Sequence, residues 1–475
     1  MLNRREFLMG TGAFVAPFIS GCAGLGFRAN EKVNVAVIGI GCRGADDIDD
    51  FVGTGLVNLI AFADTECEAE CTARTRKNYP NVPRYQDFRK MFEKHAKEID
   101  AVLVATPDHS HFVMCMTALG LGKHVYTEKP MGNTFREIQL MMDMAAAHPG
   151  LVTQMGNQGH SLANYYQAKA MAEAGMFKGT TKIVAHMNYD RRWYKWNGKV
   201  TEMFPAKDAI PADLAWDTWL SQRPYRAFNP NYIHGDWRCF YEYGNGVLGD
   251  WGAHIFDTIY DVIGLGLPES VSAVNQTGWS PVVFPMSSTV KFKFPARGKD
   301  LPACELQWWE GRENFPELPK GFRWDLKSDT PPIGDVDAPK TKDLKPGREI
   351  YLADGTVYQG MSHGSELVAC DGRKLPSFAA EHSTGSGAMP HAKNFLEAIR
   401  GNEVAHSPFA SAGVLSQMMT IGCIAQRLQA KELKFDAKTK RFTAADAPRA
   451  DALKLANTLL DCPAPRKGWE SYYKI

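Results

Sequence analysis

The sequence has almost no excess of charge of either sign. Its 54 lysine and arginine residues balance 53 aspartate and glutamate residues, so the formal net charge of the 475-residue chain is +1. The basic surplus that is typical of nucleic-acid-binding proteins is absent, and so is an acidic tail. Hydrophobic residues make up 44% of the chain and charged residues 23%, which is ordinary for a globular protein. We therefore expect no nucleic-acid partner, and the length allows two or three domains.

Long apolar runs are also scarce. The first 22 residues, MLNRREFLMGTGAFVAPFISGC, combine two arginines with an apolar run that is too short to span a bilayer, and no run of about 18 apolar residues follows. The NRREFL start resembles a twin-arginine export signal, and ISGC resembles a lipoprotein lipobox. We expect residues 1–31 to be an export signal and linker, with Cys22 as a lipid anchor that provides the only membrane contact. The protein would then be an exported, periplasmic lipoprotein, and a cytoplasmic protein with an irregular N-terminus is the alternative.

The ten cysteines do not have the spacing of a disulfide framework. Cys67 and Cys71 are separated by three residues in a predicted helix, where two thiols could ligate zinc. No second pair follows, so we interpret them as unpaired helix thiols and expect no metal. Proteins exported by the twin-arginine route are already folded, so the chain need not use disulfides even in an oxidising compartment.

The segment from residue 32 to 156 alternates short apolar strands with helices. Continuous Val/Ile/Ala strands separated by helices are typical of a parallel sheet covered on both faces. The predicted strands cover 32–39, 56–64, 100–106, 123–128 and 151–157, and the predicted helices cover 43–53, 65–78, 86–97, 110–121 and 134–147. The fold class is therefore α/β, with an N-terminal Rossmann dinucleotide-binding domain over residues 32–156.

The pattern changes from about residue 157. Longer alternating strands predict an open, mostly antiparallel sheet within a C-terminal α/β domain over residues 157–475. Residues 311–348 are rich in proline, glycine and charge and suggest a surface excursion. The predicted elements are helices over 160–174, 390–401 and 410–430, strands over 181–191, 270–278 and 288–294, and a hairpin over 351–358 that turns on Asp354-Gly355.

The stretch VAVIGIGCRG places Gly39, Gly41 and Gly44 in a G-x-G-x-x-G turn between the first strand and the first helix. These glycines allow a tight turn, close approach of a pyrophosphate and close helix packing. Asp64 ends the second predicted strand, where a carboxylate accepts hydrogen bonds from a ribose diol and repels a 2′-phosphate. We therefore predict NAD as the cofactor, while a simple turn residue is the alternative role of Asp64.

Two more predicted strands end in polar motifs. ATPDHSHF brings Thr106, Pro107 and His111 to a strand end, and HVYTEKPMG brings Lys129 to the next one. Carboxyl ends of parallel strands line the ligand crevice of such sheets. Pro130 restricts the lysine backbone to extended conformations. A solvated lysine at a strand end is the alternative interpretation.

A later motif, GDWGAHIFD, supplies candidate acid/base groups. Asp250, His254 and Asp257 lie at positions i, i+4 and i+7 of a predicted apolar helix and so share one face. This pattern suits proton transfer by His254, with Asp250 orienting the substrate or the imidazole. A buried structural His–Asp pair and a metal site are alternatives, although no third metal ligand is evident.

These motifs together resemble the Gfo/Idh/MocA oxidoreductases, named for glucose–fructose oxidoreductase and inositol dehydrogenase. The resemblance covers about residues 32–157, resumes at GDWGAHIFD and continues at HAKNFLEAIRGN (391–402). It implies a Rossmann domain followed by an α/β domain whose open sheet often mediates oligomerisation, here as a dimer or tetramer. It also implies Lys129 near nicotinamide and substrate, and Glu128 near the cofactor. Residues of about 311–380 exceed the usual family size and are expected to be an insertion.

The resemblance and the motifs give three sets of candidate residues. MGNQGHS (155–161) departs from the commoner Arg-containing loop, and we assign Asn157 and His160 to ligand contact there. The predicted catalytic residues are Lys129, His254 and Asp250. The predicted cofactor-binding residues are Gly39, Gly41, Cys42, Arg43, Gly44, Asp64, Thr106, Pro107, His111, Glu128, Lys129 and Asn157. The predicted substrate-binding residues are His160, Arg191, Trp193, Trp237, Asp250 and His254.

The predicted reaction is oxidation of a secondary hydroxyl of a sugar, glycoside or polyol. His254 takes the hydroxyl proton, hydride goes to nicotinamide, and the Lys129 ammonium stabilises the developing alkoxide. An exported enzyme meets no NAD pool, so we expect a tightly bound cofactor. An NAD-dependent glycosidase or lyase that works by transient C3 oxidation and elimination is the alternative. A non-catalytic sugar-binding lipoprotein is a further hypothesis, but binding alone does not require both Lys129 and His254.

Overall fold

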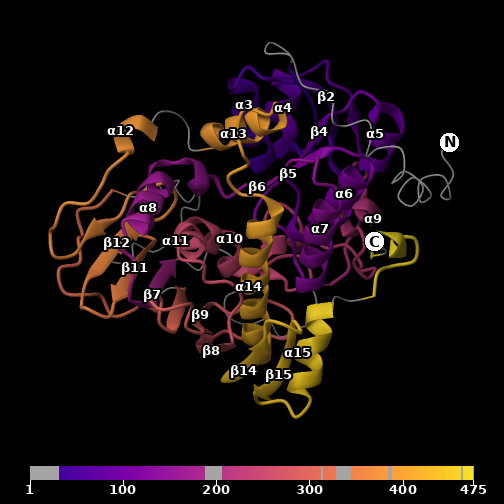
Figure 1. The fold of residues 1–475 in the computed structure, drawn as a ribbon. Helices are drawn as coiled ribbons and strands as arrows, with labels where there is room; N and C mark the ends of the chain where they lie inside the picture. Colours follow the sequence, from indigo (N-terminus) through magenta and orange to yellow (C-terminus); the bar gives the residue numbers. More distant parts are fainter. Residues whose placement is uncertain are drawn as a thin grey trace.

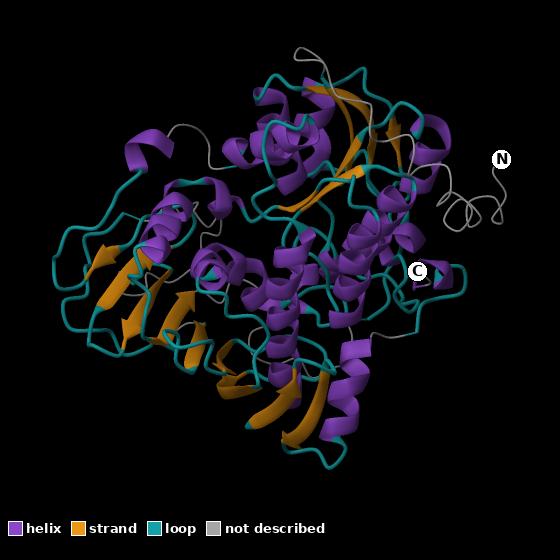
Figure 2. Ribbon diagram, in the orientation of Figure 1, coloured by secondary structure: helices purple, strands orange, loops and turns teal. Residues whose placement is uncertain are grey.

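The computed structural model describes residues 32–187, 206–311, 314–327, 344–382, 388–461 and 464–473. Cys22, Arg191 and Trp193 lie outside the described residues. The described chain forms two sheets, each covered by helices (Figures 1 and 2). Within it, no helix has both the length and the apolar character that crossing a membrane requires.

The first sheet is parallel, and its strand order is β3-β2-β1-β4-β5-β6. The chain starts in the middle, moves to one edge and then crosses to the other side of β1, which creates a crevice at the carboxyl ends of β1 and β4. The Rossmann fold is therefore confirmed. The strands are β1 (Val33–Ile38), β2 (Val57–Ala63), β3 (Arg84–Tyr85), β4 (Ala101–Val104), β5 (His124–Thr127) and β6 (Thr153–Met155).

Helices cover both faces of this sheet, and one of them comes from far along the chain. α13 (Met389–Ile399) packs beside α3 (Arg43–Gly53), where the rings of Phe51 and Phe395 lie 6.1 Å apart (Figure 1). The α13 segment thus packs on the N-terminal domain between the part of the chain that forms β7 to β13 of the second sheet and the part that forms its last two strands, β14 and β15. The other helices of this domain are η1 (Glu70–Thr72), α4 (Ala73–Asn78), α5 (Phe88–His95), α6 (Asp108–Gly120) and α7 (Phe135–Ala147).

The second sheet has the strand order β13-β12-β11-β7-β10-β9-β8-β14-β15. All its neighbouring strands whose pairing is described are antiparallel except β7 and β10, so the predicted mostly antiparallel α/β domain is confirmed. The strands are β7 (Thr180–Met187), β8 (Ser270–Thr277), β9 (Ser287–Phe294), β10 (Cys304–Glu310), β11 (Gly347–Leu352), β12 (Val357–Met361), β13 (Val368–Ala369), β14 (Glu432–Asp436) and β15 (Arg441–Asp446).

Long helices lie between this sheet and the first domain (Figure 2). The apolar helix α14 (Phe409–Leu428) crosses the middle of the molecule, and Gly422 lets it approach Phe292 of β9 closely, because a Cβ there would lie 2.6 Å from that ring. The neighbouring helices are α8 (Ala163–Glu173), α10 (Gly246–Ile255), α11 (Asp257–Val262) and α15 (Ala452–Asp461). The remaining short elements are η2 (Gln158–Ser161), α9 (Trp216–Leu220), η4 (Pro230–Tyr232), η5 (Asp236–Cys239), α12 (Ala379–His382) and η6 (Glu470–Tyr473).

Part of the expected insertion belongs to the second sheet. β11, β12 and β13 lie within the expected insertion over about 311–380 and extend the sheet outward from β7. Their hairpin turns at Asp354-Gly355 as predicted, with Gly355 at φ 90°. This extension matters for the site, because the loop after β12 reaches α10.

Candidate active site

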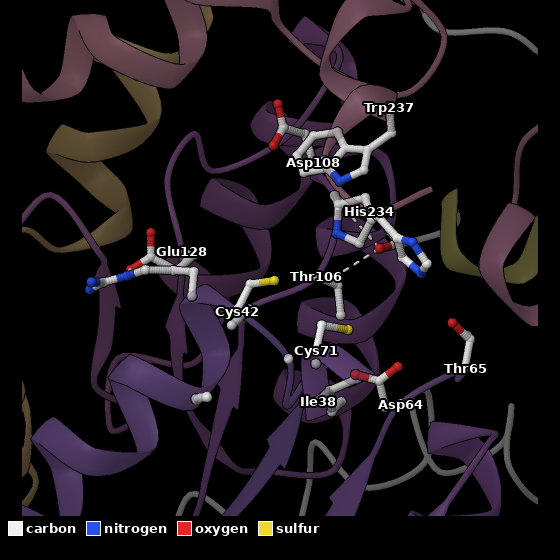
Figure 3. A pocket seen from close by; sticks show the side chains of 18 of the residues that line it. Ile38, Cys42, Asp64, Thr65, Cys71, Thr106, Asp108, Glu128, His234 and Trp237 are labelled. Atoms are coloured by element: carbon white, nitrogen blue, oxygen red, sulfur yellow. Dashed lines mark hydrogen bonds and ion pairs between the residues drawn. The ribbon is translucent and has the colours of Figure 1, made fainter. Parts of the chain in front are cut away.

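A cavity of about 800 Å³ opens at the carboxyl edge of the first sheet (Figure 3). The ends of β1, β2, β4 and β5 form one side, and the chain around residues 218–254 forms the other. The predicted residues that line it are Gly39, Gly41, Cys42, Arg43, Asp64, Thr106, Pro107, Glu128, Lys129, Trp237, Asp250 and His254.

The glycine-rich turn leaves room for a pyrophosphate to approach the backbone closely. Gly39 has φ 88°, and a Cβ there would lie 2.5 Å from the Ala105 carbonyl oxygen. Gly44 does not line the cavity. It packs the start of α3 against the turn, because a Cβ there would collide with the Gly39 carbonyl. The N-terminus of α3 therefore faces the cavity with backbone N–H groups that suit a phosphate.

Asp64 stands at the end of β2 beside this turn. Its carboxylate accepts hydrogen bonds from the backbone N–H of Ile40 at 2.9 Å and of Glu66 at 3.0 Å. Burial raises the pKa of Asp64, and these two bonds counteract that effect. The carboxylate is thus fixed at the place where a Rossmann fold holds a ribose.

Lys129 is anchored by the helix across the cavity. Its Nζ donates to the Asp250 backbone carbonyl at 2.6 Å and to Asp250 Oδ1 at 2.9 Å. Burial lowers the pKa of Lys129, and the Asp250 carboxylate opposes that shift. The peptide bond that follows, Lys129–Pro130, is cis. An ammonium has three donors, so two bonds to Asp250 leave one for a substrate oxygen.

Glu128 lies directly after β5, next to Lys129, and also lines the cavity. Arg43 Nε donates to its carboxylate at 3.2 Å, and so does the Lys129 backbone N–H at 3.2 Å. The first of the two glycines of MGNQGHS has a role here, because a Cβ at Gly156 would collide with the Glu128 carboxylate.

His254 faces a second histidine that the sequence did not reveal. The rings of His254 and His363 stack with centroids 4.3 Å apart and 13° between their planes. The His363 backbone N–H donates to the His254 carbonyl at 2.8 Å. Burial lowers the pKa of His254 well below its ordinary value, and the neighbouring His363 and Lys129 add to this effect. A neutral imidazole is the form that accepts a proton.

Asp250 does not orient the His254 imidazole through Nδ1. That atom is buried without a hydrogen-bond partner among the described residues, whereas Asp250 Oδ1 pairs with Lys129 and lies 3.3 Å from Arg238 Nε. Arg238 also lies over the Trp237 ring at 4.1 Å. Asp250 therefore positions two cations of the cavity wall.

The structure separates Asp257 from this group. The helix breaks at Phe256, and Asp257 begins α11. Its Oδ2 accepts from Asn157 Nδ2 at 2.7 Å and lies 3.0 Å from His160 Nε2. Burial lowers the pKa of His160, but the Asp257 carboxylate raises it to about 9.

Three more predicted residues do not reach the cavity lining. Asn157 and His160 are buried in the Asp257 cluster, where Ser407 Oγ also donates to Asn157 at 2.6 Å. His111 lies under the site, with its ring nitrogens 3.0 Å from the Pro130 carbonyl and 2.7 Å from the Thr106 carbonyl. These side chains hold β6, η2 and the two strand ends in place, and their contacts with a ligand stay predictions.

Sequence patterns missed several groups of the cavity wall. His363 comes from the loop after β12, and Arg238 and His234 come from an irregular segment before α10. His234 Nε2 lies 2.9 Å from Glu66 Oε2 across the cavity mouth. None of these residues belongs to a periodic pattern or a motif, so only the fold brings them to the site.

The fold and the cavity define a two-domain dinucleotide-binding protein. Residues 33–155 match the model of an oxidoreductase family with an NAD-binding Rossmann fold, and residues 163–274 match the C-terminal alpha/beta domain of an oxidoreductase family. The chain belongs to the Gfo/Idh/MocA oxidoreductases. His363 lies beyond both matched segments.

Curated relatives include glycosidases. A glycosyl hydrolase family 109 protein of Streptomyces niveus is 29% identical over 295 residues, which are 61% of this chain and 51% of the relative. An alpha-N-acetylgalactosaminidase of Shewanella oneidensis is 25% identical over 169 residues, which are 30% of this chain and 37% of the relative. The chain thus spans about half or less of the length of these relatives.

Solved structures share the fold. The WlbA dehydrogenase of Chromobacterium violaceum, in complex with NADH and UDP-GlcNAcA, has a TM-score of 0.57 at 14% identity, with 87% of this chain and 98% of that chain covered. The myo-inositol 2-dehydrogenase of Lactobacillus plantarum has a TM-score of 0.51 at 14% identity, with 86% and 100% covered.

The residues of this chain fit NAD. The turn at Gly39 and Gly41 has no side chain that would fill the space in front of α3, and the Asp64 carboxylate is fixed beside it. An acidic group at this position accepts bonds from a ribose diol and disfavours a 2′-phosphate.

Proposed function

We propose that the protein is an NAD-dependent oxidoreductase that acts on a secondary hydroxyl of a sugar, glycoside or polyol. One observation carries this proposal: a Lys129 ammonium held by Asp250 lines the same cavity as His254, whose pKa is lowered, and the glycine turn. Binding alone would not require a cation and a neutral base at one site.

Each side chain has a defined task in this proposal. Lys129 donates to the substrate oxygen and stabilises negative charge that develops there. His254 accepts the proton of that oxygen, and His363 stacks on the imidazole to fix its plane. When bound, NAD accepts the hydride of the carbinol carbon and, in a redox-neutral cycle, returns it at the end of the turnover.

The second candidate is an NAD-dependent glycosidase or lyase, and the family 109 names of several relatives favour it. Oxidation at C3 acidifies the proton on C2, so an aglycone at C1 can leave by elimination. Water then adds, and the ketone is reduced again. The same Lys129 and His254 would serve the oxidation and the reduction.

Solvent isotope incorporation distinguishes the two candidates. The purified full chain is incubated with nitrophenyl glycosides in D₂O, and the sugar product is analysed by NMR. The dehydrogenase proposal predicts a keto sugar, reduced nicotinamide and an intact glycosidic bond. The glycosidase candidate predicts released nitrophenol and deuterium at C2 without net reduction. Neither product from any glycoside or free sugar would contradict both.

We also propose that the protein is exported and anchored through Cys22, with NAD bound tightly because no NAD pool is available outside the cytoplasm. The NRREFL and ISGC motifs support this proposal. Radiolabelled palmitate should label the wild-type chain but not C22A in cells. A homo-oligomer, dimer or tetramer, is proposed from the family resemblance and is tested by light scattering of the purified protein.

A further inference from the structure

Two thiols meet at the glycine-rich turn, and the proposed reaction uses neither. Cys42 lies between Gly41 and Arg43, and Cys71 lies in η1. The Cys42 backbone N–H donates to the Cys71 carbonyl at 3.3 Å. A Cβ at Gly41 would lie 2.9 Å from Cys71 Sγ, so η1 is pressed against the turn. Both side chains line the cavity next to each other (Figure 3).

The two thiols differ in reactivity. A hydrogen bond from Cys71 lowers the pKa of Cys42 to about 6, with Arg238 and His234 contributing, although burial and Asp46 oppose the shift. The same hydrogen bond raises the pKa of Cys71. Cys42 is exposed and Cys71 is half-buried. An accessible thiolate beside a protonated thiol is the arrangement of an attacking cysteine and its resolving partner.

The backbone of Cys42 marks the position as unusual. Cys42 has φ 44° and ψ −109°, a conformation that L-residues rarely adopt and that glycine adopts freely. Strain of this kind concentrates at functional sites. Of the other cysteines in the described chain, Cys370 is half-buried and the rest are buried.

We propose that Cys42 and Cys71 are a modification site, where a disulfide forms that excludes the dinucleotide from the turn. The reagent is a small disulfide such as oxidised glutathione. The Cys42 thiolate attacks one sulfur and releases one glutathione thiolate. Cys71 then gives its proton to the released glutathione thiolate, attacks the Cys42 sulfur and releases the second glutathione thiolate. Two protein thiols are oxidised by two electrons, and one small disulfide is reduced to two thiols.

The disulfide would exclude NAD because Cys42 lies on the glycine-rich turn that binds the dinucleotide. A pyrophosphate at the N-terminus of α3 would cover the Cys42 thiolate and repel its charge, so bound NAD protects it. To the extent that bound NAD shifts the thiol–disulfide equilibrium away from the disulfide, the disulfide weakens NAD binding by the same factor, because linkage between two binding equilibria is reciprocal. The proposal rests on the NAD-binding turn and not on turnover of any substrate.

The first test uses the reduced, NAD-free full chain, incubated with oxidised glutathione and analysed by intact mass and peptide mapping. We expect a loss of two hydrogen atoms and one Cys42–Cys71 linked peptide. NAD at about tenfold above its Kd should slow this reaction about tenfold, because the free turn becomes about tenfold rarer. Oxidation at other cysteines, or formation of the linked peptide at the same rate with and without NAD, would overturn the proposal.

The second test compares NAD affinity by calorimetry before and after oxidation, each variant against its own reduced form. Oxidised wild-type protein should bind NAD at least tenfold more weakly and recover with dithiothreitol. C42S and C71S should show no change on oxidation, whereas the matched control C370S should respond like wild type. If the disulfide form bound NAD with unchanged affinity, the disulfide would not exclude NAD from the turn, and the proposal would be wrong. Turnover enters neither test, so loss of the proposed activity would leave both readouts intact.

Discussion

Lys129 owes its geometry to Asp250 on the facing helix and to its own strand end. Because both Asp250 oxygens that it contacts lie within 2.9 Å, its third donor has little freedom of direction. Position and charge of this donor are what the proposed alkoxide stabilisation needs.

Replacing this lysine tests its role. K129M keeps the length of the side chain and removes the charge, and we expect kcat to fall about 10²- to 10³-fold, as for other lost oxyanion donors. The matched control is K178M, because Lys178 pairs with Asp300 at the surface outside the cavity. Steady-state kinetics, with a substrate that the wild-type protein turns over, measure kcat of K129M and of K178M. Turnover of K129M near the wild-type value would show that Lys129 has no role in the chemistry.

His363 should control the pH dependence of the reaction. The base must be neutral, so activity is lost as the pH falls through the pKa of His254. Burial and His363 both lower that pKa, and H363A removes a neighbouring ring and admits water. We expect the acid limb of the kcat/KM profile to move to higher pH in H363A. H382A is the control, because His382 stacks on Tyr166 away from the cavity. An acid limb that stays in place or moves to lower pH would contradict this assignment.

At the scale of elements, the sequence predicted the strand-end motifs well and the irregular segments poorly. The helix over 43–53 matches α3, and the turn and strand ends come together because parallel strands share one carboxyl edge. Helical periodicity placed Asp257 with His254, but the helix breaks at Phe256 and sends Asp257 to His160. The break at Phe256 contains no proline and no change of periodicity, so nothing in the local sequence predicts it. Nothing in the local sequence predicts the position of the loop that carries His363 either.

The Asp257 cluster predicts a pH-dependent stability. The folded pKa of His160 is raised to about 9, above its unfolded value of about 6.5, so the pair contributes fully below about pH 6.5 and its contribution is lost as the pH rises through about 9. H160Q leaves a buried carboxylate without its cation and should lower the free energy of unfolding by about 3–5 kcal/mol at pH 6. Urea unfolding at pH 6 and pH 10 checks this. An equal deficit of H160Q at both pH values would exclude a charged pair.

At the scale of the whole molecule, the site depends on both sheets and on a late return of the chain. α13 comes back to the first domain after β7 to β13 of the second sheet and before β14 and β15, and Phe395 is fully buried against Phe51. Sequence periodicity predicted this helix but could not place it, because burial partners so far apart in sequence leave no local pattern.

Because α13 packs on the N-terminal domain, we expect this domain to lose stability when the Phe395 side chain is shortened. F395A should lower the free energy of unfolding by about 3–5 kcal/mol, as for other large buried rings. Denaturant unfolding followed by fluorescence measures the change. V404A is the control, since Val404 is 81% exposed just after the same helix. A loss no larger in F395A than in V404A would mean that α13 does not support the domain.

In the proposed reaction, Lys129 and His254 act on a carbinol beside bound NAD. Its most direct test is rapid mixing of the NAD-loaded full chain with a panel of sugars, polyols and glycosides, followed at the absorbance band of reduced nicotinamide. We expect at least one compound to produce this band, transiently or lastingly, in wild-type protein, and we expect K129M and H254Q to lose the band while still binding NAD. If no compound produced the band in protein shown to hold NAD, or if both variants produced a band equal to that of the wild type, Lys129 and His254 would not have the proposed roles.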